Sequence, residues 1–285
     1  MNEIAVPPGK DGDTAGERIV RLSDGDIHVV ESGPTSATTV VLIHGLAGST
    51  ASWEPIMFAL KDFHVVRVDM LGHGESAKPA DGYGIAEQGR RVGAVLDRLG
   101  VRRAIVVGHS TGGSVATALA TQRRELITAI ALIDTGPRIS AFIGNTLAGR
   151  LLYVPVVGPL AWRLRSDSTI RAAARTAVTR DVRIPDQIIA DVRGMTYRAF
   201  IATSDAARAF LAERPVPDRL TDLGLPVLVI FGAQDRRWQP SSAADYRVVP
   251  HARVEILDGV GHTPMLEEPE VTAALLRGFV AECPQ

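Results

Sequence analysis

The stretch AIVVGHSTGGSVATALA, residues 104–120, runs from branched apolar residues through a glycine-rich turn into a series of small residues. A short apolar run that ends at turn residues is typical of a buried strand, and the small residues after it suit a helix. The turn GHSTG, residues 108–112, has the spacing G-x-S-x-G. In a strand–turn–helix setting this spacing holds a serine hydroxyl clear of the sheet, because the glycines let strand and helix approach closely.

Two phosphate-binding patterns can be tested against the same turn. A Walker loop needs a lysine to reach the phosphates, and the turn contains none. A dinucleotide-binding loop needs glycine at the position that Ser110 occupies. The sequence therefore predicts Ser110 as a nucleophile, the alternative being a turn that packs a helix on a strand.

A serine hydroxyl is a weak nucleophile unless a base accepts its proton and an acid orients that base. Asp235 follows the apolar run PVLVIFG, and His262 lies in the loop after the next apolar run. Along the chain, the order Ser, Asp, His is the order expected for a fold in which the serine lies in such a strand–turn–helix turn. Asp134, which ends the run ITAIALID, is a second candidate for the acid, and we favour Asp235.

Eight apolar runs rich in Val and Ile indicate strands, and helical patterns fall between most of them. The first two alternate partly and suit a hairpin, whereas the later ones are nearly continuous, as in a parallel sheet covered on both faces. We expect a doubly wound, mostly parallel α/β sheet of about eight strands. The runs are residues 18–22, 26–33, 38–45, 64–70, 104–109, 127–134, 226–232 and 253–259.

One interval, between Asp134 and Pro226, lacks a convincing strand and is rich in Ala and Arg. We interpret residues 137–215 as an inserted helical cap. The remaining divisions are a flexible arm, residues 1–17, and a core formed by residues 18–136 and 216–285.

Charge is unevenly distributed although the whole chain carries a net charge of −1. Residues 138–214 contain 12 Arg, no Lys and 6 acidic residues, a net of +6, which leaves −7 for the rest. The near-neutral total argues against nucleic-acid binding. The basic cap either neutralises the acidic core or attracts an anionic substrate.

The remaining composition excludes several other classes. No apolar segment has the roughly 20 residues that span a bilayer, so we expect no stable membrane insertion. The N-terminus does not resemble a signal peptide, and a cytoplasmic location is expected. The single cysteine, Cys283, cannot form an internal disulfide. Since no His, Asp or Glu cluster has metal-ligand spacing, neither a metal nor an organic cofactor is expected.

The chain resembles the capped, serine-dependent members of the α/β-hydrolase family from about Arg18 to Val280. The resemblance implies that the backbone amides of Leu46 and Thr111 form the oxyanion hole. Besides GHSTGG, the segments that carry it are LIHGLAGSTASW (42–53), VDMLGHGESAKP (68–79), FGAQDRRW (231–238) and GHTPMLEEP (261–269).

The function predicted from these features is hydrolysis of a carboxylic ester or related acyl bond in a small molecule with an apolar part. Ser110 is the nucleophile, His262 the base and Asp235 the orienting acid. Relatives that open epoxides or displace halide carry aspartate at the position of Ser110 in this turn. The serine makes those reactions unexpected. Carbon–carbon hydrolysis, lactone hydrolysis and perhydrolysis by the same triad stay open, as does a non-catalytic ligand-binding module. The sequence leaves the oligomeric state undetermined.

Overall fold

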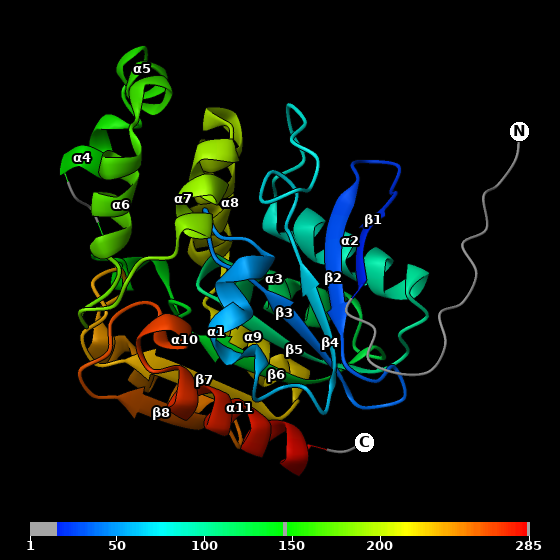
Figure 1. Ribbon diagram of the computed structural model, residues 1–285. Coiled ribbons are helices and arrows are strands. Elements are labelled where there is room, and N and C mark those ends of the chain that lie inside the picture. The colour runs from blue at the N-terminus through cyan, green and yellow to red at the C-terminus, as the bar shows by residue number, and fades with distance from the viewer. Residues whose placement is uncertain (1–15, 145–146, 284–285) are drawn as a thin grey trace, which may run out of the picture.

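An eight-stranded sheet forms the centre of the molecule in the computed structural model, which describes residues 16–144 and 147–283 (Figure 1). The spatial order is β1-β2-β4-β3-β5-β6-β7-β8. β1 and β2 form an antiparallel hairpin, β2 is antiparallel to β4, and every other neighbouring pair is parallel. The strands are β1 (Gly16–Val20), β2 (Ile27–Ser32), β3 (Thr39–Ile43), β4 (His64–Val68), β5 (Ala104–His109), β6 (Ile127–Ile133), β7 (Val227–Gly232) and β8 (Arg253–Leu257). The predicted fold class is confirmed.

Successive residues of the central strands enter two different cores, one on each face of the sheet. In β3, Val41 and Ile43 pack in one core, and Val40 and Leu42 pack in the other. This is the geometry of a strand whose side chains alternate between two covered faces, and it explains the nearly continuous apolar runs.

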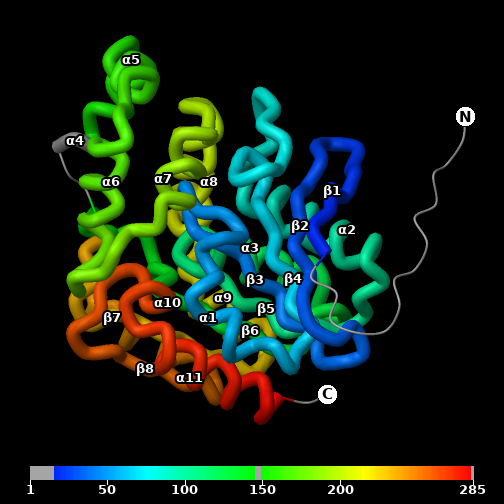
Figure 2. The backbone as a smooth tube through the Cα atoms, in the orientation of Figure 1, coloured from blue at the N-terminus to red at the C-terminus, as the bar shows by residue number. Residues whose placement is uncertain are grey.

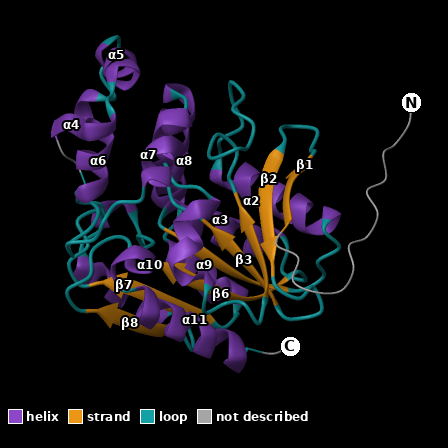
Figure 3. Ribbon diagram, in the orientation of Figure 1, coloured by secondary structure: helices purple, strands orange, loops and turns teal. Residues whose placement is uncertain are grey.

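Helices cover both faces (Figure 3). The first core is closed by α2 (Ile85–Arg98), α3 (Thr111–Gln122) and α9 (Val216–Leu223), and the second by α1 (Glu54–Met57) and α11 (Pro269–Glu282). This part also contains the short helices η1 (Thr50–Trp53), η3 (Pro240–Val248) and α10 (Pro264–Glu267), whereas η2 (Ile139–Ala141) lies in the interval between β6 and α9. α2 ends at Arg98, and Gly100, two residues later, has a φ of 74°, the left-handed conformation that commonly ends a helix.

Between β6 and α9 the described chain forms helices and no strand, apart from one bridge between Phe142 and Trp238. These are α4 (Leu147–Leu151), α5 (Val157–Leu164), α6 (Asp167–Arg175), α7 (Asp186–Gly194) and α8 (Tyr197–Glu213). They correspond to the interval interpreted as a cap, and we keep that name for residues 137–215. Figure 2 shows α5 at the extremity of the molecule, far from β7 and β8.

The predicted N-terminal arm, residues 1–17, lies mostly outside the described residues. Gly16 and Glu17 already belong to β1, where Gly16 pairs with Glu31 and Glu17 with Val30. The sheet therefore starts two residues earlier than the sequence indicated. Within the described ranges no helix is both long enough and apolar enough to cross a membrane.

Candidate active site

Ser110 occupies the turn between β5 and α3 in a backbone conformation that L-residues rarely adopt. Its φ is 52° and its ψ is −118°. The residue is held there by its neighbours: its amide donates to the Ile133 carbonyl at 2.9 Å, and its own carbonyl accepts from the Gly113 amide at 3.0 Å. A strained serine fixed on both sides is the arrangement that presents a hydroxyl at a sharp turn.

The glycines around Ser110 are required by close backbone approach. A Cβ atom on Gly108 would lie 2.4 Å from the Gly112 carbonyl oxygen, and one on Gly112 would lie 2.2 Å from the Ile43 carbonyl oxygen. Gly45, in the neighbouring loop, would place a Cβ 3.2 Å from the Ser110 Cβ. Strand, turn and loop can therefore meet at Ser110 because three positions carry no side chain.

The structure brings Ser110, His262 and Asp235 together in one hydrogen-bonded chain. The Ser110 Oγ lies 3.0 Å from His262 Nε2, and His262 Nδ1 lies 2.8 Å from Asp235 Oδ2. The other carboxylate oxygen, Oδ1, accepts the amides of Arg237 at 2.6 Å and Trp238 at 3.2 Å. The sequence predicted this set from its order and from its positions at strand ends.

Electrostatics favour an ionised Asp235. Burial opposes the charge, but attraction to His262, the hydrogen bond from its ring and the amides of Arg237 and Trp238 together lower the pKa of Asp235. An ionised acid on Nδ1 fixes the tautomer that leaves Nε2 free to accept the serine proton.

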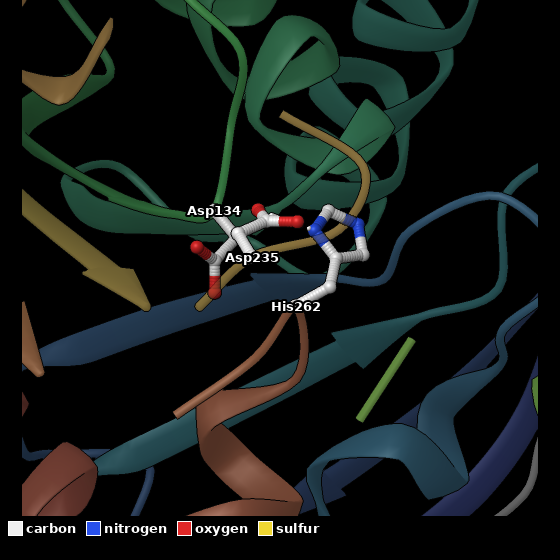
Figure 4. Close-up of side chains that lie close together, drawn as sticks. All are labelled: Asp134, Asp235 and His262. Carbon is white, nitrogen blue, oxygen red and sulfur yellow. Dashed lines mark hydrogen bonds and ion pairs between the residues drawn. The ribbon is translucent and has the colours of Figure 1, made fainter. Parts of the chain in front are cut away.

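Asp134, the less favoured candidate for the acid, is adjacent to this hydrogen-bonded chain. Figure 4 shows it beside Asp235, whose carboxyl turns toward the His262 ring. Asp134 is fully buried, and its Oδ1 accepts the Gly232 amide at 2.9 Å. Its Oδ2 is buried with no hydrogen-bond partner among the described residues. Burial and the negative charge of Asp235 raise the pKa of Asp134 well above its usual range, so this carboxyl stays protonated beside an ionised one.

Asp134, Asp235 and His262 each place one potential metal-ligand atom within 4.8 Å of the others. Two ligands on one tetrahedral zinc lie about 3.3 Å apart, given bonds near 2.0 Å. The 2.8 Å between Asp235 Oδ2 and His262 Nδ1 is instead the length of a charge-assisted hydrogen bond. The geometry favours a hydrogen-bonded carboxylate–imidazole pair over a metal site, and the expected lack of a metal stays a prediction.

The loop after β3 carries Leu46, the first of the two amides that the family resemblance assigns to the oxyanion hole. No acceptor for its N–H is found in the described part of the chain. Thr111, the second, is the first residue of α3, where amides have no partner within the helix. Neither amide is paired within the loop or helix that carries it, and the assignment to the oxyanion hole stays a prediction.

His44 holds the loop that carries Leu46 in place through two hydrogen bonds. Its Nε2 accepts the Met70 amide at 3.0 Å, and its Nδ1 donates to the Gly45 carbonyl at 2.8 Å. Since burial lowers the pKa of His44, the ring stays neutral and can perform both roles at once. These two bonds give His44 a structural role in the loop after β3.

His109, next to Ser110, makes a contact that the sequence did not reveal. Its Nε2 donates to the carbonyl oxygen of His262 at 2.8 Å, and the two rings lie 5.1 Å apart. Burial and the neighbouring His262 lower the pKa of His109 to about 3, so the ring remains neutral. The residue before Ser110 thus supports the backbone of the proposed base.

Glu267 is a second residue that sequence reasoning missed. Its buried carboxylate accepts four backbone amides: Thr179 at 2.6 Å, Arg180 and Gly261 at 3.0 Å each, and Thr263 at 3.2 Å. Two of these belong to the cap and two flank His262. One carboxylate therefore joins the cap to the loop of the proposed base.

Further contacts connect the cap to both loops at the site. The His262 amide donates to the Ala177 carbonyl at 2.7 Å. On the opposite side, Ser49 Oγ donates to Oδ2 of Asp191, on α7, at 2.5 Å. The cap is thus bonded to the loop that carries Leu46 and to the loop that carries His262, a coupling that spacing along the chain cannot show.

Comparisons with known proteins extend these observations. The profile of a family described as "alpha/beta hydrolase fold" matches residues 38–269. A Bacillus subtilis protein named "Putative 2-succinyl-6-hydroxy-2,4-cyclohexadiene-1-carboxylate synthase" is 25% identical over 276 residues, covering 92% of this chain and 97% of that one. "Lipase 1" of Psychrobacter immobilis is 26% identical over 269 residues, covering 90% and 82% respectively.

Among solved structures, the 2-hydroxy-6-oxo-6-phenylhexa-2,4-dienoate hydrolase of a Rhodococcus species (strain RHA1) superposes with a TM-score of 0.78. The match covers 95% of this chain and all of that chain, at 22% identity. At this identity the likeness bears on the fold alone, whereas the family match and the sequence relatives support hydrolase activity.

Proposed function

We propose that this chain, which belongs to the alpha/beta hydrolase fold family, is a serine hydrolase that cleaves a carboxylic ester or related acyl bond of a small molecule. The observation that carries the proposal is the continuous hydrogen-bonded chain from Ser110 through His262 to Asp235. A partly exposed hydroxyl at one end and a buried, ionised carboxylate at the other form the arrangement that activates a serine.

Acylation follows from these positions. The Ser110 Oγ attacks the substrate carbonyl carbon while His262 Nε2 takes the hydroxyl proton, and the carbonyl oxygen becomes an oxyanion. The amides of Leu46 and Thr111 donate to that oxyanion, each contributing about 3–4 kcal/mol in comparable sites. Asp235 stabilises the imidazolium that forms. His262 then gives the proton to the leaving alcohol as its bond to the carbonyl carbon breaks.

Deacylation uses the same groups with water in place of serine. Water attacks the acyl carbonyl, His262 accepts a proton from it, and the Ser110 oxygen leaves as the second tetrahedral intermediate collapses. The proton returns to Ser110 and the carboxylic acid is released. His109 and Glu267 hold the loop of His262 by backbone contacts, which keeps Nε2 at Ser110 through both half-reactions.

The cap supplies selection in this proposal, as lids do. It is bonded to the loops of Leu46 and His262, so substrate reaches Ser110 past cap residues. The cap's excess of arginine favours an anionic substrate group. If so, kcat/KM for an anionic ester falls with added salt more steeply than for a neutral ester.

The test compares Ser110→Ala with Ser114→Ala, a buried serine four residues along the same helix. On short aryl esters, Ser110→Ala should lower kcat by at least about 10⁴-fold, since the nucleophile is lost while binding remains. Ser114→Ala should stay within a few-fold of the natural protein. Near-normal turnover by Ser110→Ala would show that another group performs the reaction.

Other chemistries share this triad, namely carbon–carbon hydrolysis, lactone hydrolysis and perhydrolysis. A panel of esters, lactones and vinylogous diketones separates them by kcat/KM. A binding module without turnover would fail to react with a fluorophosphonate, which requires an activated serine. We expect labelling of the natural protein and of Ser114→Ala, and none of Ser110→Ala.

A further inference from the structure

The end of the cap most distant from the sheet exposes an unusual amount of apolar surface. We call residues 150–165, the segment RLLYVPVVGPLAWRLR around α5, the cap tip. Val156 is 79% exposed, Leu164 70% and Leu160 54%. Soluble proteins expose single apolar residues freely but rarely expose them side by side along one segment. Four further apolar side chains of the tip are also exposed, those of Leu151, Tyr153, Val154 and Val157.

The tip is held in place with these side chains outward. Trp162 is its buried anchor: the ring lies 4.6 Å from that of Phe200 on α8, and its Nε1 donates to the Met195 carbonyl at 3.1 Å. The Tyr197 hydroxyl donates to the Leu152 carbonyl at 2.6 Å. Trp162 therefore fastens α5 to α8, and Leu152 also packs against the core, whereas Val156, Leu160 and Leu164 stay the most exposed apolar side chains of the tip. Figure 2 shows α5 at the outer end of the cap.

Every charged residue within the tip segment is an arginine. Residues 139–166 contain three arginines and no acidic residue or lysine. Arg150 and Arg163 are exposed, and no carboxylate pairs with either among the residues that the structure describes. Arg165 bonds to the carbonyls of Val192 and Arg193 and lies 4.1 Å above the Trp162 ring. Apolar side chains flanked by uncompensated cations characterise segments that rest in the interface of an anionic membrane.

The backbone adds an independent observation at the most exposed residue. Val156 has φ 69° and ψ −48°, in the left-handed region, which a β-branched side chain strongly disfavours. Nothing around a side chain with four fifths of its surface exposed repays this strain by packing. Strained residues persist where they serve a function, and here the strain directs an apolar side chain outward.

We propose that the cap tip docks on the surface of a membrane that contains anionic lipids. The tip inserts apolar side chains at the level of the headgroups, while Arg150 and Arg163 pair with lipid phosphates. α5 has eight residues and lies on the surface without spanning it. A second copy of this chain is a poorer occupant, since joining two tips would bring uncompensated arginines together. The inference goes beyond the proposed function and does not depend on it.

The experiment measures co-sedimentation of the full chain with vesicles of phosphatidylcholine and phosphatidylglycerol. We expect binding to mixed vesicles, weaker binding at high salt, and little binding to vesicles of phosphatidylcholine alone. Each of Arg150→Gln and Arg163→Gln should lower the partition coefficient about 5-fold. The matched control is Arg98→Gln, an exposed arginine at the end of α2, which should leave binding unchanged.

The apolar contribution is tested by Leu160→Gln with Leu164→Gln, which should reduce partitioning at least about tenfold. Val156→Asn guards against misfolding, because asparagine tolerates the left-handed conformation and should fold at least as well. Val248→Asn, an exposed valine on η3, is its control. Binding that Val156→Asn weakens, with an unchanged melting temperature, supports the proposal.

The proposal would be overturned by no binding of the natural protein to anionic vesicles, or by binding of the Leu160 and Leu164 double variant as strong as that of the natural protein. A dimer in solution that this variant dissociates would also overturn it. Capture of an acidic protein by the tip without any vesicle binding would also do so. Hydrolysis of a soluble, uncharged aryl ester should be unchanged in every tip variant, so failure of membrane docking is distinguishable from failure of the serine hydrolase proposal.

Discussion

The sheet edge at Ser110 and the cap tip at Val156 both contain a non-glycine residue in the left-handed region, in opposite surroundings. At Ser110, φ 52° is fixed by hydrogen bonds on both sides and by glycines that let three segments meet. At Val156, φ 69° occurs on an exposed segment. The first position is determined by the interior of the protein, whereas the second faces outward.

This difference separates two ways in which a protein uses strain. At the sheet edge, packing and hydrogen bonds fix the backbone conformation of Ser110, and each side chain of the proposed triad is hydrogen-bonded to another group. At the tip, the side chains of Val156, Leu160 and Leu164 each leave more than half of their surface exposed. The groups at the sheet edge therefore pair with one another, whereas the exposed apolar side chains of the tip would be buried only by a surface placed against them. Each prediction below tests one side of this contrast.

The largest effect is expected from the two carboxyls at the sheet edge. Asp235→Asn should lower kcat about 10⁴-fold, since an amide stabilises neither the correct tautomer nor the imidazolium. Asp134→Asn should leave kcat within about 3-fold, because the amide resembles the protonated carboxyl that the site holds. Steady-state kinetics on one aryl ester measure both. A larger loss from Asp134→Asn would reverse the assignment of the acid.

Next in size is the effect of a methyl group at two glycines. In Gly112→Ala the new Cβ would lie 2.2 Å from the Ile43 carbonyl oxygen and 2.4 Å from that of His44, so backbone has to move. We expect a loss of about 3 kcal/mol in the free energy of unfolding. In Gly194→Ala, at the end of α7, nothing lies within 4 Å, and stability should rise by about 0.5–1 kcal/mol.

Urea unfolding of both variants at the same pH tests whether the sheet edge is the more tightly packed region. Equal changes in the free energy of unfolding of the two variants would contradict the contrast between the sheet edge and the cap.

The part of the molecule that the sequence predicts well is the part governed by local patterns. Eight apolar runs gave eight strands, and the elbow spacing and chain order placed Ser110, Asp235 and His262 at one sheet edge, because parallel strands bring their carboxyl ends together. The division into core and cap and the oxyanion amides stay interpretations.

The contacts that the sequence did not predict depend on residues far apart in the chain. Glu267 reads as one acid of the pair EE before a helix, yet its carboxylate collects amides about 88 residues away. The proton on Asp134 depends on burial beside Asp235, 101 positions later. No spacing rule encodes such neighbours. The cap tip is strongly apolar in sequence, yet most of its apolar side chains are exposed because α5 projects outward.

Glu267 joins the two regions, and a smaller effect is expected there. Glu267→Gln replaces a carboxylate that accepts four amides by a group with one acceptor oxygen and one donor. We expect kcat to fall about 10-fold with little change in KM, because the loop of His262 loses its fixed position while the substrate contacts remain. Glu270→Gln, an exposed acid three residues later, is the control. A rise in KM alone would place Glu267 outside the positioning of His262.

The smallest effect concerns how stability responds to pH at Asp134. An aspartate in the unfolded chain ionises near pH 3.9, whereas burial and Asp235 keep Asp134 protonated to higher pH in the folded chain. Between these two pKa values the folded protein binds the extra proton, so the contribution of Asp134 to stability declines as pH rises through that window.

Asparagine carries no such proton. The free energy of unfolding of Asp134→Asn, relative to the natural protein, should therefore rise from about pH 4 upward and level off above the folded pKa of Asp134. Urea titrations between pH 3 and 8 measure it, with Asp205→Asn, an exposed acid on α8, reporting the loss of one surface charge. A difference that stays constant across this range would mean that Asp134 is ionised in the folded protein. Two adjacent buried carboxylates would then carry like charges at the sheet edge. The sheet edge would not have all its groups paired, and its contrast with the exposed cap tip would be wrong.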